Sequence, residues 1–170
     1  MQRLRQNGRP PGKRAARLAG QTARVEAVAE GVADEVAAEH DHGDGDARGH
    51  GEVLRLKVDT TTFTTKAHGE VPHLLATAIF DPATGAISLF ALNRSTEDAM
   101  DIALDLRGLG NGLRITGATE LHDPDLKKIN SKAAPDAISP APNATASLEN
   151  GRLTAQLKPQ SWNVFALSPR

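Results

Sequence analysis

The sequence predicts an all-β protein: an antiparallel, jelly-roll-like β-sandwich preceded by a helical or disordered N-terminal extension. Apolar and polar residues alternate with period two in at least five segments between Val53 and Leu167, and this is the spacing of half-buried strands. Turn residues separate these segments, and the intervals between them show no pattern for the crossover helices of a parallel sheet.

Large aromatic side chains divide the chain at residue 51. The part from 52 to 170 holds every aromatic residue of the sequence: Phe63, Phe80, Phe90, Trp162 and Phe165. Residues 1–51 hold none, so they contain little of the apolar area that a core must bury. We therefore expect the sandwich in residues 52–170 and a separate extension in residues 1–51.

The extension is rich in Ala, Arg and Gly, and its charges are segregated. Seven Lys and Arg residues precede eight Asp and Glu residues within residues 3–46. Apolar residues recur at heptad-like spacing at Leu18, Val25, Val32 and Val36. This spacing predicts a weak, loosely attached helix over residues 13–38, with a partner helix as the alternative reading.

A run of alternating His and Asp follows the predicted helix, at residues 40–46, with His50 beyond it. Imidazole and carboxylate groups are ligands for divalent metals. Runs interleaved with glycine are typical of flexible linkers, however, so we expect a linker here and no metal site.

The first half of the sandwich is predicted as follows. Residues 53–59 alternate between apolar and charged, and residues 60–65 are β-branched and polar. Residues 74–80 and 87–92 are apolar on both faces, and Asp-Pro-Ala-Thr-Gly at residues 81–85 lies between them. This pattern predicts a central hairpin.

The second half contains the clearest amphipathic strand, residues 100–106, followed by a strand over residues 113–121. Asp123-Pro124 predicts a short helical turn through Lys128, and residues 131–146 are expected to form a long loop. Strands at residues 152–157 and 162–167 complete the domain. The side chains expected in the core are Phe90, Leu104, Trp162 and Phe165.

The sequence offers no recognisable catalytic machinery. It has no Cys, no Gly-rich phosphate loop and no nucleophile elbow. His68, His73 and His122 are far apart in sequence and are interpreted as surface or packing residues. Most acids fit turns, strand ends and polar faces. We therefore expect no catalytic residue, no cofactor-binding residue and no metal ligand in this chain.

Composition also restricts partners. The net charge of −1 gives no indication of nucleic-acid or membrane binding, and no apolar run is long enough to span a bilayer. A cytoplasmic location is the expectation. Asn93-Arg94-Ser95 and Asn143-Ala144-Thr145 match the glycosylation pattern, which we interpret as coincidence. The aromatics lie in apolar strands, which favours core positions over sugar-stacking platforms.

Four blocks of sequence together resemble the C-terminal domain of glycoside hydrolase family 51, the α-L-arabinofuranosidases. The blocks are VLRLKVDTTTFTTKAHGEVPHLLATAIFD, LFALNRS, ELHDPDLKKINS and LKPQSWNVFAL. They extend over about residues 51–167, and the most specific parts are Asn93-Arg94-Ser95 and Ser161-Trp162-Asn163-Val164. His73 departs from the pattern, because the family commonly has an aromatic residue after Val-Pro.

The resemblance implies an accessory domain that packs beside a catalytic (β/α)₈ barrel or takes part in an oligomer interface. Arabinose-containing polysaccharides or oligosaccharides would then be bound only through that barrel, which also holds both catalytic glutamates. We expect a fragment or a stand-alone copy of this domain that is inactive alone and exposes apolar area where the barrel would lie. The composition of residues 1–50 would suit a truncated or frame-shifted gene. The alternatives are a carbohydrate-binding module and an interaction module.

Overall fold

The computed structural model describes residues 21–28, 49–109 and 112–170, and twelve strands account for most of them. The strands are β1 Gln21–Val28, β2 Glu52–Asp59, β3 Thr62–Thr65, β4 Gly69–Pro72, β5 Leu74–Asp81, β6 Ala86–Asn93, β7 Met100–Asp105, β8 Leu113–Leu121, β9 Ala141–Pro142, β10 Ser147–Glu149, β11 Arg152–Leu157 and β12 Ser161–Pro169. Within these ranges the one helical element is a single 3-10 turn, η2, at Arg107–Leu109. The all-β prediction is confirmed.

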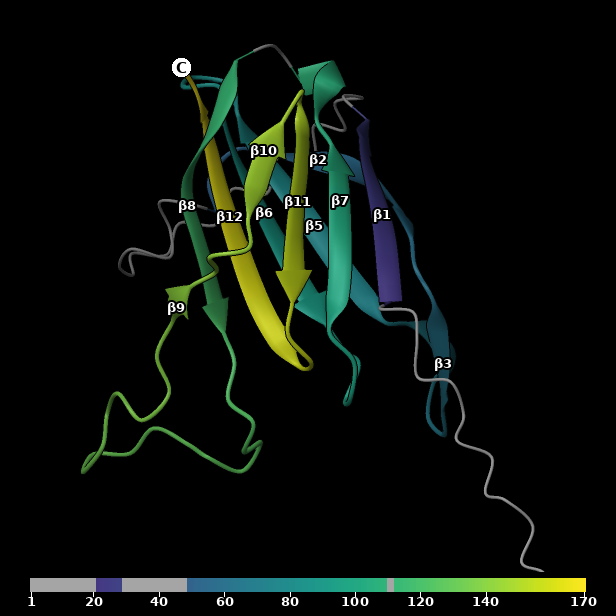
Figure 1. Cartoon of the computed structure of the whole chain (residues 1–170), viewed down its shortest axis with the longest axis vertical. Coiled ribbons are helices and arrows are strands. Elements are labelled where there is room, and N and C mark those ends of the chain that lie inside the picture. The colour runs from purple at the N-terminus through teal and green to yellow at the C-terminus, as the bar shows by residue number, and fades with distance from the viewer. Residues whose placement is uncertain (1–20, 29–48, 110–111) are drawn as a thin grey trace, which may run out of the picture.

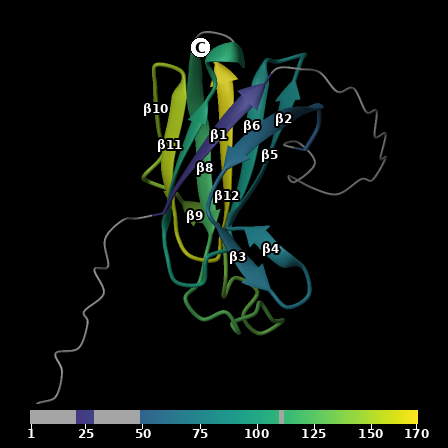
Figure 2. The same cartoon turned by 90° about the vertical axis from the view of Figure 1, so that its right-hand side faces the viewer.

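Ten strands form one curled sheet in the order β10-β11-β7-β1-β2-β5-β6-β12-β8-β9. The sheet folds back on itself, so that β10, β11, β7 and β1 form one layer and β5, β6, β12 and β8 form the other (Figure 1). Strand β2 belongs to both layers, since residues 52–54 pair with β5 and residues 55–59 pair with β1. Strands β3 and β4 form a separate hairpin at one end (Figure 2).

The core lies between the two layers and consists of the inward positions of their strands. In β11, Leu153, Ala155 and Leu157 are buried, and the residues between them are exposed and polar. Phe165 and Leu167 of β12 are buried in the other layer. Burying this apolar area contributes roughly 25 cal/mol per Å², which makes the core the main source of the domain's stability.

The predicted hairpin is confirmed as β5 and β6, and its turn has the expected chemistry. The Asp81 carboxylate accepts hydrogen bonds from the Thr84 hydroxyl at 2.6 Å and from the Ala83 amide at 2.9 Å, which lowers the pKa of Asp81. The Gly85 amide donates to the Asp81 carbonyl at 2.8 Å. Gly85 has φ of 71°, a conformation that favours glycine, so the turn residues set the register of the hairpin.

The helix predicted over residues 13–38 is wrong for Gln21–Val28, which form strand β1. This strand runs antiparallel to β2 and parallel to β7, so it is an integral part of the sandwich and not a loosely attached extension. The domain boundary predicted at residue 51 is therefore wrong for this segment. The rest of the predicted helix and the His-Asp run at residues 40–46 lie outside the described residues.

The reason for the difference is the ambiguity of a short apolar pattern. Val25 fits a heptad-like repeat, but Ala23, Val25 and Ala27 also alternate with polar residues at period two. Pairing with β2 and β7 decides between the two, because it gives the backbone partners on both sides and buries Ala23 and Val25.

Two aromatic residues expected in the core lie on its outside. Leu104 and Phe165 are buried as predicted, but Trp162 is 45% exposed and Phe90 is only partly buried. Successive residues of a strand point to opposite faces, so the inward direction of Phe165 in β12 places Trp162 outward.

Polar residues take the inward positions at that end of β12. Ser161 and Asn163 are fully buried. The Asn163 amide donates to the Ser161 hydroxyl at 2.8 Å, and the Ser161 hydroxyl donates to the Lys158 carbonyl at 2.7 Å. Asn143 donates to the Asn163 carbonyl oxygen at 3.1 Å. These bonds satisfy the buried polar groups, which is why polar residues can replace apolar ones here.

Both sequences that match the glycosylation pattern belong to buried hydrogen-bonded turns. Asn93 is fully buried; its amide donates to the Asp98 and Lys158 carbonyls, each at 3.0 Å, and its oxygen accepts from the Ser95 backbone amide at 3.0 Å. The Asn143 oxygen accepts from the Thr145 amide in the same way, at 3.0 Å. An Asn that bonds the amide two residues on is a common turn, so the match has a structural cause.

The segment after β8 forms a β-turn where a helical turn was predicted. The Lys128 amide donates to the Asp125 carbonyl at 3.0 Å, which is a single bond and does not start a helix. The Asp123 carboxylate accepts from the Asp125 amide at 2.9 Å and from the Lys128 ammonium at 2.6 Å. The predicted loop at residues 131–146 includes strand β9 and extends beyond the end of the sandwich that also carries the β3–β4 hairpin (Figures 1 and 2).

Replacing Leu104 by Ala should lower the free energy of unfolding by about 2–5 kcal/mol, because the fully buried side chain leaves a cavity. The matched control is Leu75→Ala on the outer face, where a change of about 0.5 kcal/mol is expected. Urea unfolding followed by circular dichroism measures both. Equal losses in the two variants would contradict the inward direction of Leu104.

Candidate interaction surface

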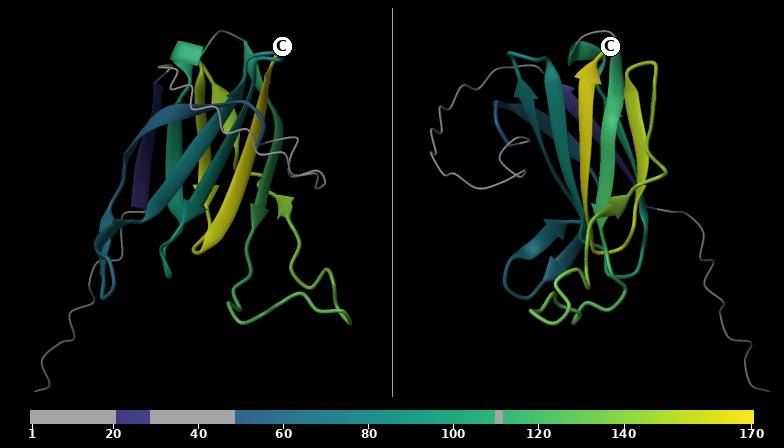
Figure 3. Two further views of the ribbon diagram at one scale, coloured as in Figure 1. Left: turned by 180° about the vertical axis from the view of Figure 1, so that it is seen from behind. Right: turned by 90° about the vertical axis from the view of Figure 1, so that its left-hand side faces the viewer.

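The layer formed by β5, β6, β12 and β8, whose outer face is toward the viewer in the left panel of Figure 3, has apolar side chains at several outward positions. The strand register places Leu75, Leu92, Trp162 and Leu121 in one row across these four strands. Phe90 and Val164 pair with each other in the adjacent outward row. We call these six residues the outer apolar face.

This face remains accessible to solvent. Trp162 and Leu75 are each 45% exposed and Leu121 is 38% exposed. Strands β5 and β6 are apolar on both faces, whereas a sheet with one solvated face normally alternates apolar with polar residues. Large apolar side chains are therefore exposed on this face, and the composition of β5 and β6 resembles that of a sheet covered on both sides.

The surroundings of Trp162 distinguish a protein interface from a sugar site. Its ring lies 6.3 Å from the ring of Phe90, and its neighbours on the adjacent strands are Leu92 and Leu121. A sugar site combines a stacking ring with polar groups that bind the hydroxyls. Aliphatic neighbours supply no such groups, so this arrangement favours a protein partner.

The loop that follows β8 extends the apolar surface. β8 ends at Leu121, and Leu126 and Ile129 on the loop are both exposed. The row that contains Trp162 lies at the same end of the layer, because β12 begins at Ser161 and β6 ends at Asn93. The outer apolar face and the loop therefore offer apolar groups at one end of the domain.

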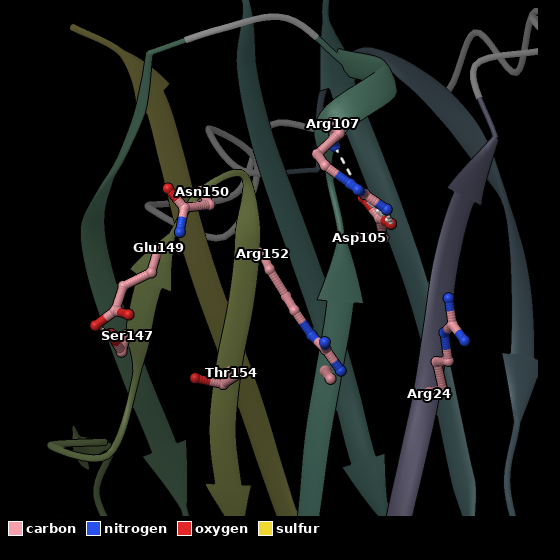
Figure 4. A pocket seen from close by; sticks show the side chains of 9 residues that line it. Arg24, Asp105, Arg107, Ser147, Glu149, Asn150, Arg152 and Thr154 are labelled. Atoms are coloured by element: carbon pink, nitrogen blue, oxygen red, sulfur yellow. Dashed lines mark hydrogen bonds and ion pairs between the residues drawn. The ribbon is translucent and has the colours of Figure 1, made fainter.

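The opposite outer face, formed by β10, β11, β7 and β1, is polar. Its open hollow has a volume of about 580 Å³, and the charged residues among those that line it are Arg24, Asp105, Arg107, Glu149 and Arg152 (Figure 4). The Arg107 guanidinium binds both oxygens of the Asp105 carboxylate and holds the pKa of that carboxyl well below its usual range. The charges that line the hollow have both signs, and its lining residues include no aromatic side chain.

Two glutamates of the sandwich have structural partners. Glu120 is buried, and its carboxylate forms an ion pair with the Lys158 ammonium. Glu70 accepts a hydrogen bond from the Thr62 hydroxyl across the β3–β4 hairpin. A glycosidase needs two carboxyls facing each other across a substrate pocket, and these two belong to separate local contacts.

His73 has the packing role expected from the sequence. Its ring stacks on Phe63, with ring centroids 4.7 Å apart, and its Nδ1 lies 2.9 Å from the Thr61 hydroxyl. The Arg94 guanidinium also lies over the Phe63 ring, 5.2 Å from its centre. His68 takes part in the β3–β4 turn, where its amide donates to Thr65.

Among the described residues, no three His, Cys, Asp or Glu side chains are grouped so that they could hold a metal ion. No helix in the same ranges is long and apolar enough to cross a membrane.

Residues 46–161 match the family described as the α-L-arabinofuranosidase C-terminal domain. An intracellular exo-α-(1→5)-L-arabinofuranosidase of Streptomyces lividans is 40% identical over 118 residues, which cover 68% of this chain and 17% of the relative. An exo-α-(1→6)-L-arabinofuranosidase of Bifidobacterium longum is 34% identical over 116 residues, which cover 67% of this chain and 22% of that relative.

Solved structures show the same fold. A family 51 α-L-arabinofuranosidase from Bifidobacterium longum has a TM-score of 0.62 and 28% identity, over 68% of this chain and 22% of that chain. The GH51 arabinofuranosidase from Xanthomonas axonopodis pv. citri has a TM-score of 0.59 and 19% identity, over 69% of this chain and 23% of that chain. This chain thus spans about a fifth of the length of these relatives, and it belongs to the family of α-L-arabinofuranosidase C-terminal domains.

Proposed function

We propose that this chain is a non-catalytic accessory domain of an intracellular α-L-arabinofuranosidase, and that it packs its outer apolar face against a catalytic (β/α)₈ barrel. The activity of the whole enzyme would be the hydrolysis of terminal α-L-arabinofuranosides. Family membership and the names of the relatives, several of which are called intracellular, support this proposal.

The outer apolar face is the observation that carries the proposal. Soluble monomers seldom expose a contiguous row such as Leu75, Leu92, Trp162 and Leu121. Permanent interfaces have the composition of a core cut in half, and a tryptophan near the middle of such a face is a typical energetic anchor. A barrel that covers this row would remove its apolar area from water.

We expect the isolated domain to be catalytically inactive on chemical grounds. Retaining glycosidases need an acid/base and a nucleophile about 5–5.5 Å apart on either side of the scissile bond. Glu120 is held by Lys158, and Glu70 is held by Thr62. In the family that the sequence resembles, both catalytic glutamates belong to the barrel.

A carbohydrate-binding role is the second candidate, because Trp162 is exposed. Trp162 is the single tryptophan of the chain, so its fluorescence reports directly on this site. We expect arabino-oligosaccharides to leave the fluorescence unchanged. A saturable fluorescence change in the wild-type chain, with a heat of binding in titration calorimetry that is lost in Trp162→Ala, would favour the sugar-binding role over the interface.

We expect the purified chain to show no hydrolysis of aryl α-L-arabinofuranosides above background, at least about 10⁴-fold below the full-length Streptomyces lividans relative, because both catalytic carboxyls would be missing. Release of the aryl group measures the rate. Turnover that is abolished by Glu70→Gln or Glu120→Gln would show that the domain has a catalytic site of its own.

Removing the apolar groups of the outer face should make the chain less adhesive. In the double variant Leu75→Ser with Trp162→Ser, binding of a hydrophobic dye should fall at least about twofold and self-association should decrease. The matched control is Val53→Ser, which changes an exposed apolar residue outside the defined face.

Dye fluorescence and light scattering measure both properties at matched concentrations. A parent chain that stays monomeric and binds no dye at high concentration would contradict an exposed interface. An equal decrease of dye binding and self-association in the double variant and in Val53→Ser would contradict the location of the interface on β5 and β12.

A further inference from the structure

Strand β1 fills a gap between β2 and β7 that the rest of the described chain leaves open. Six of its residues pair in parallel with β7, from Gln21 opposite Met100 to Glu26 opposite Asp105. Five pair antiparallel with β2, from Arg24 opposite Asp59 to Val28 opposite Arg55. Residues 46–161 match the domain family, so β1 lies outside the matched region.

The gap would leave backbone groups unpaired if β1 were absent. Residues 55–59 of β2 have no strand partner other than β1, and β7 would keep only β11. The three strands β10, β11 and β7 would then have no strand pairing with the other layer. Unpaired backbone groups next to a core are unfavourable, and an open strand edge is a template for another strand.

Side chains make the gap selective for this segment. Ala23 and Val25 point into the core and are fully buried, so the inward positions accept small apolar groups. Arg24 points outward and forms an ion pair with Glu26 at 2.9 Å. At the start of the strand, Gln21 donates to the Asp98 carboxylate at 3.3 Å and accepts from the Thr61 hydroxyl at 3.2 Å.

We propose that the gap between β2 and β7 is a strand-acceptor site. Its ligand is an extended peptide of about eight residues with small apolar side chains inward and polar side chains outward, added by backbone pairing on both sides. Residues 21–28 of this chain, Gln-Thr-Ala-Arg-Val-Glu-Ala-Val, occupy the site, and the same peptide supplied separately takes their place. This inference does not depend on the proposed docking to a barrel.

The experiment uses the full chain with a specific protease site inserted between residues 29 and 48, so that cleavage separates β1 from β2. After cleavage, the N-terminal piece should co-elute with the remainder in size-exclusion chromatography, and the far-ultraviolet circular dichroism should stay unchanged. A fluorescent peptide of residues 21–28, added in excess at a urea concentration just below the unfolding midpoint, should then be incorporated at one label per chain.

Matched variants of β1 separate specific pairing from general adhesion. Val25→Asp places a charge in the core and should reduce the retained N-terminal piece at least about tenfold. Arg24→Gln changes an outward residue of the same strand and should change retention less than about twofold. The same two substitutions in the fluorescent peptide should have the same effects on its incorporation.

Two results would overturn the proposal. One is a cleaved N-terminal piece that separates at once while the remainder stays monomeric and keeps its circular dichroism. The other is retention without any incorporation of the peptide. Amide hydrogen exchange on the intact wild-type chain decides the case if Val25→Asp does not fold: β1 should be protected to the same degree as β2 and β7, and exchange as fast as in a free peptide would contradict the site.

Discussion

Backbone pairing of β1 with both β2 and β7 joins the two layers of this sandwich into one continuous sheet. The core requires both layers to face each other, and the hydrogen bonds at this junction hold one layer at a defined register to the other. Burial of Ala23 and Val25 adds side-chain packing at the same place. The position of the outer apolar face depends on this arrangement, because it determines which side of β5, β6, β12 and β8 the core covers.

The two outer faces of the sandwich differ in a way that bears on function. On the β11 side, arginines and acids of opposite sign lie close together, as in the bidentate pair of Arg107 and Asp105, and such a surface is well solvated. On the β12 side, Trp162 has aliphatic neighbours and no compensating polar groups in its row. The charged face on the β11 side is therefore well hydrated in water. Covering the apolar face on the β12 side with another protein domain would remove apolar area from water, which is favourable.

Local alternation was sufficient to predict β2, β5, β6, β7, β8, β11 and β12, since each carries its own period-two pattern or a doubly apolar run. Strand β1 was missed for two reasons. One of its two partner strands, β7, lies more than seventy residues later in the sequence. The pattern of its eight residues also fits a helix and a strand equally well. Only long-range strand pairing determines whether such a segment forms a helix or a strand.

The sequence predicted an exposed apolar surface, but it did not predict which residues form that surface. The apolar runs of β5 and β6 predicted a central hairpin, and the family resemblance implied an exposed apolar area, but hydrophobicity alone could not tell the inner side of these strands from the outer one. Trp162 was assigned to the core because the sequence does not reveal that Ser161 and Asn163 satisfy each other's hydrogen bonds inside it. The row across four strands becomes visible only from their register.

Amide hydrogen exchange tests most directly the claim that the outer apolar face docks to a catalytic barrel. The exchange of this chain would be measured alone and with the catalytic region of the Streptomyces lividans relative. The matched C-terminal part of that relative would first be removed. The proposed docking predicts a complex in which exchange slows at residues 74–77, 90–93, 119–129 and 161–164, the segments that carry the outer apolar face and its adjoining loop. It predicts unchanged exchange at residues 145–154, on the arginine-lined side. Slower exchange on the arginine-lined side alone, or no complex with a folded catalytic region, would contradict the account.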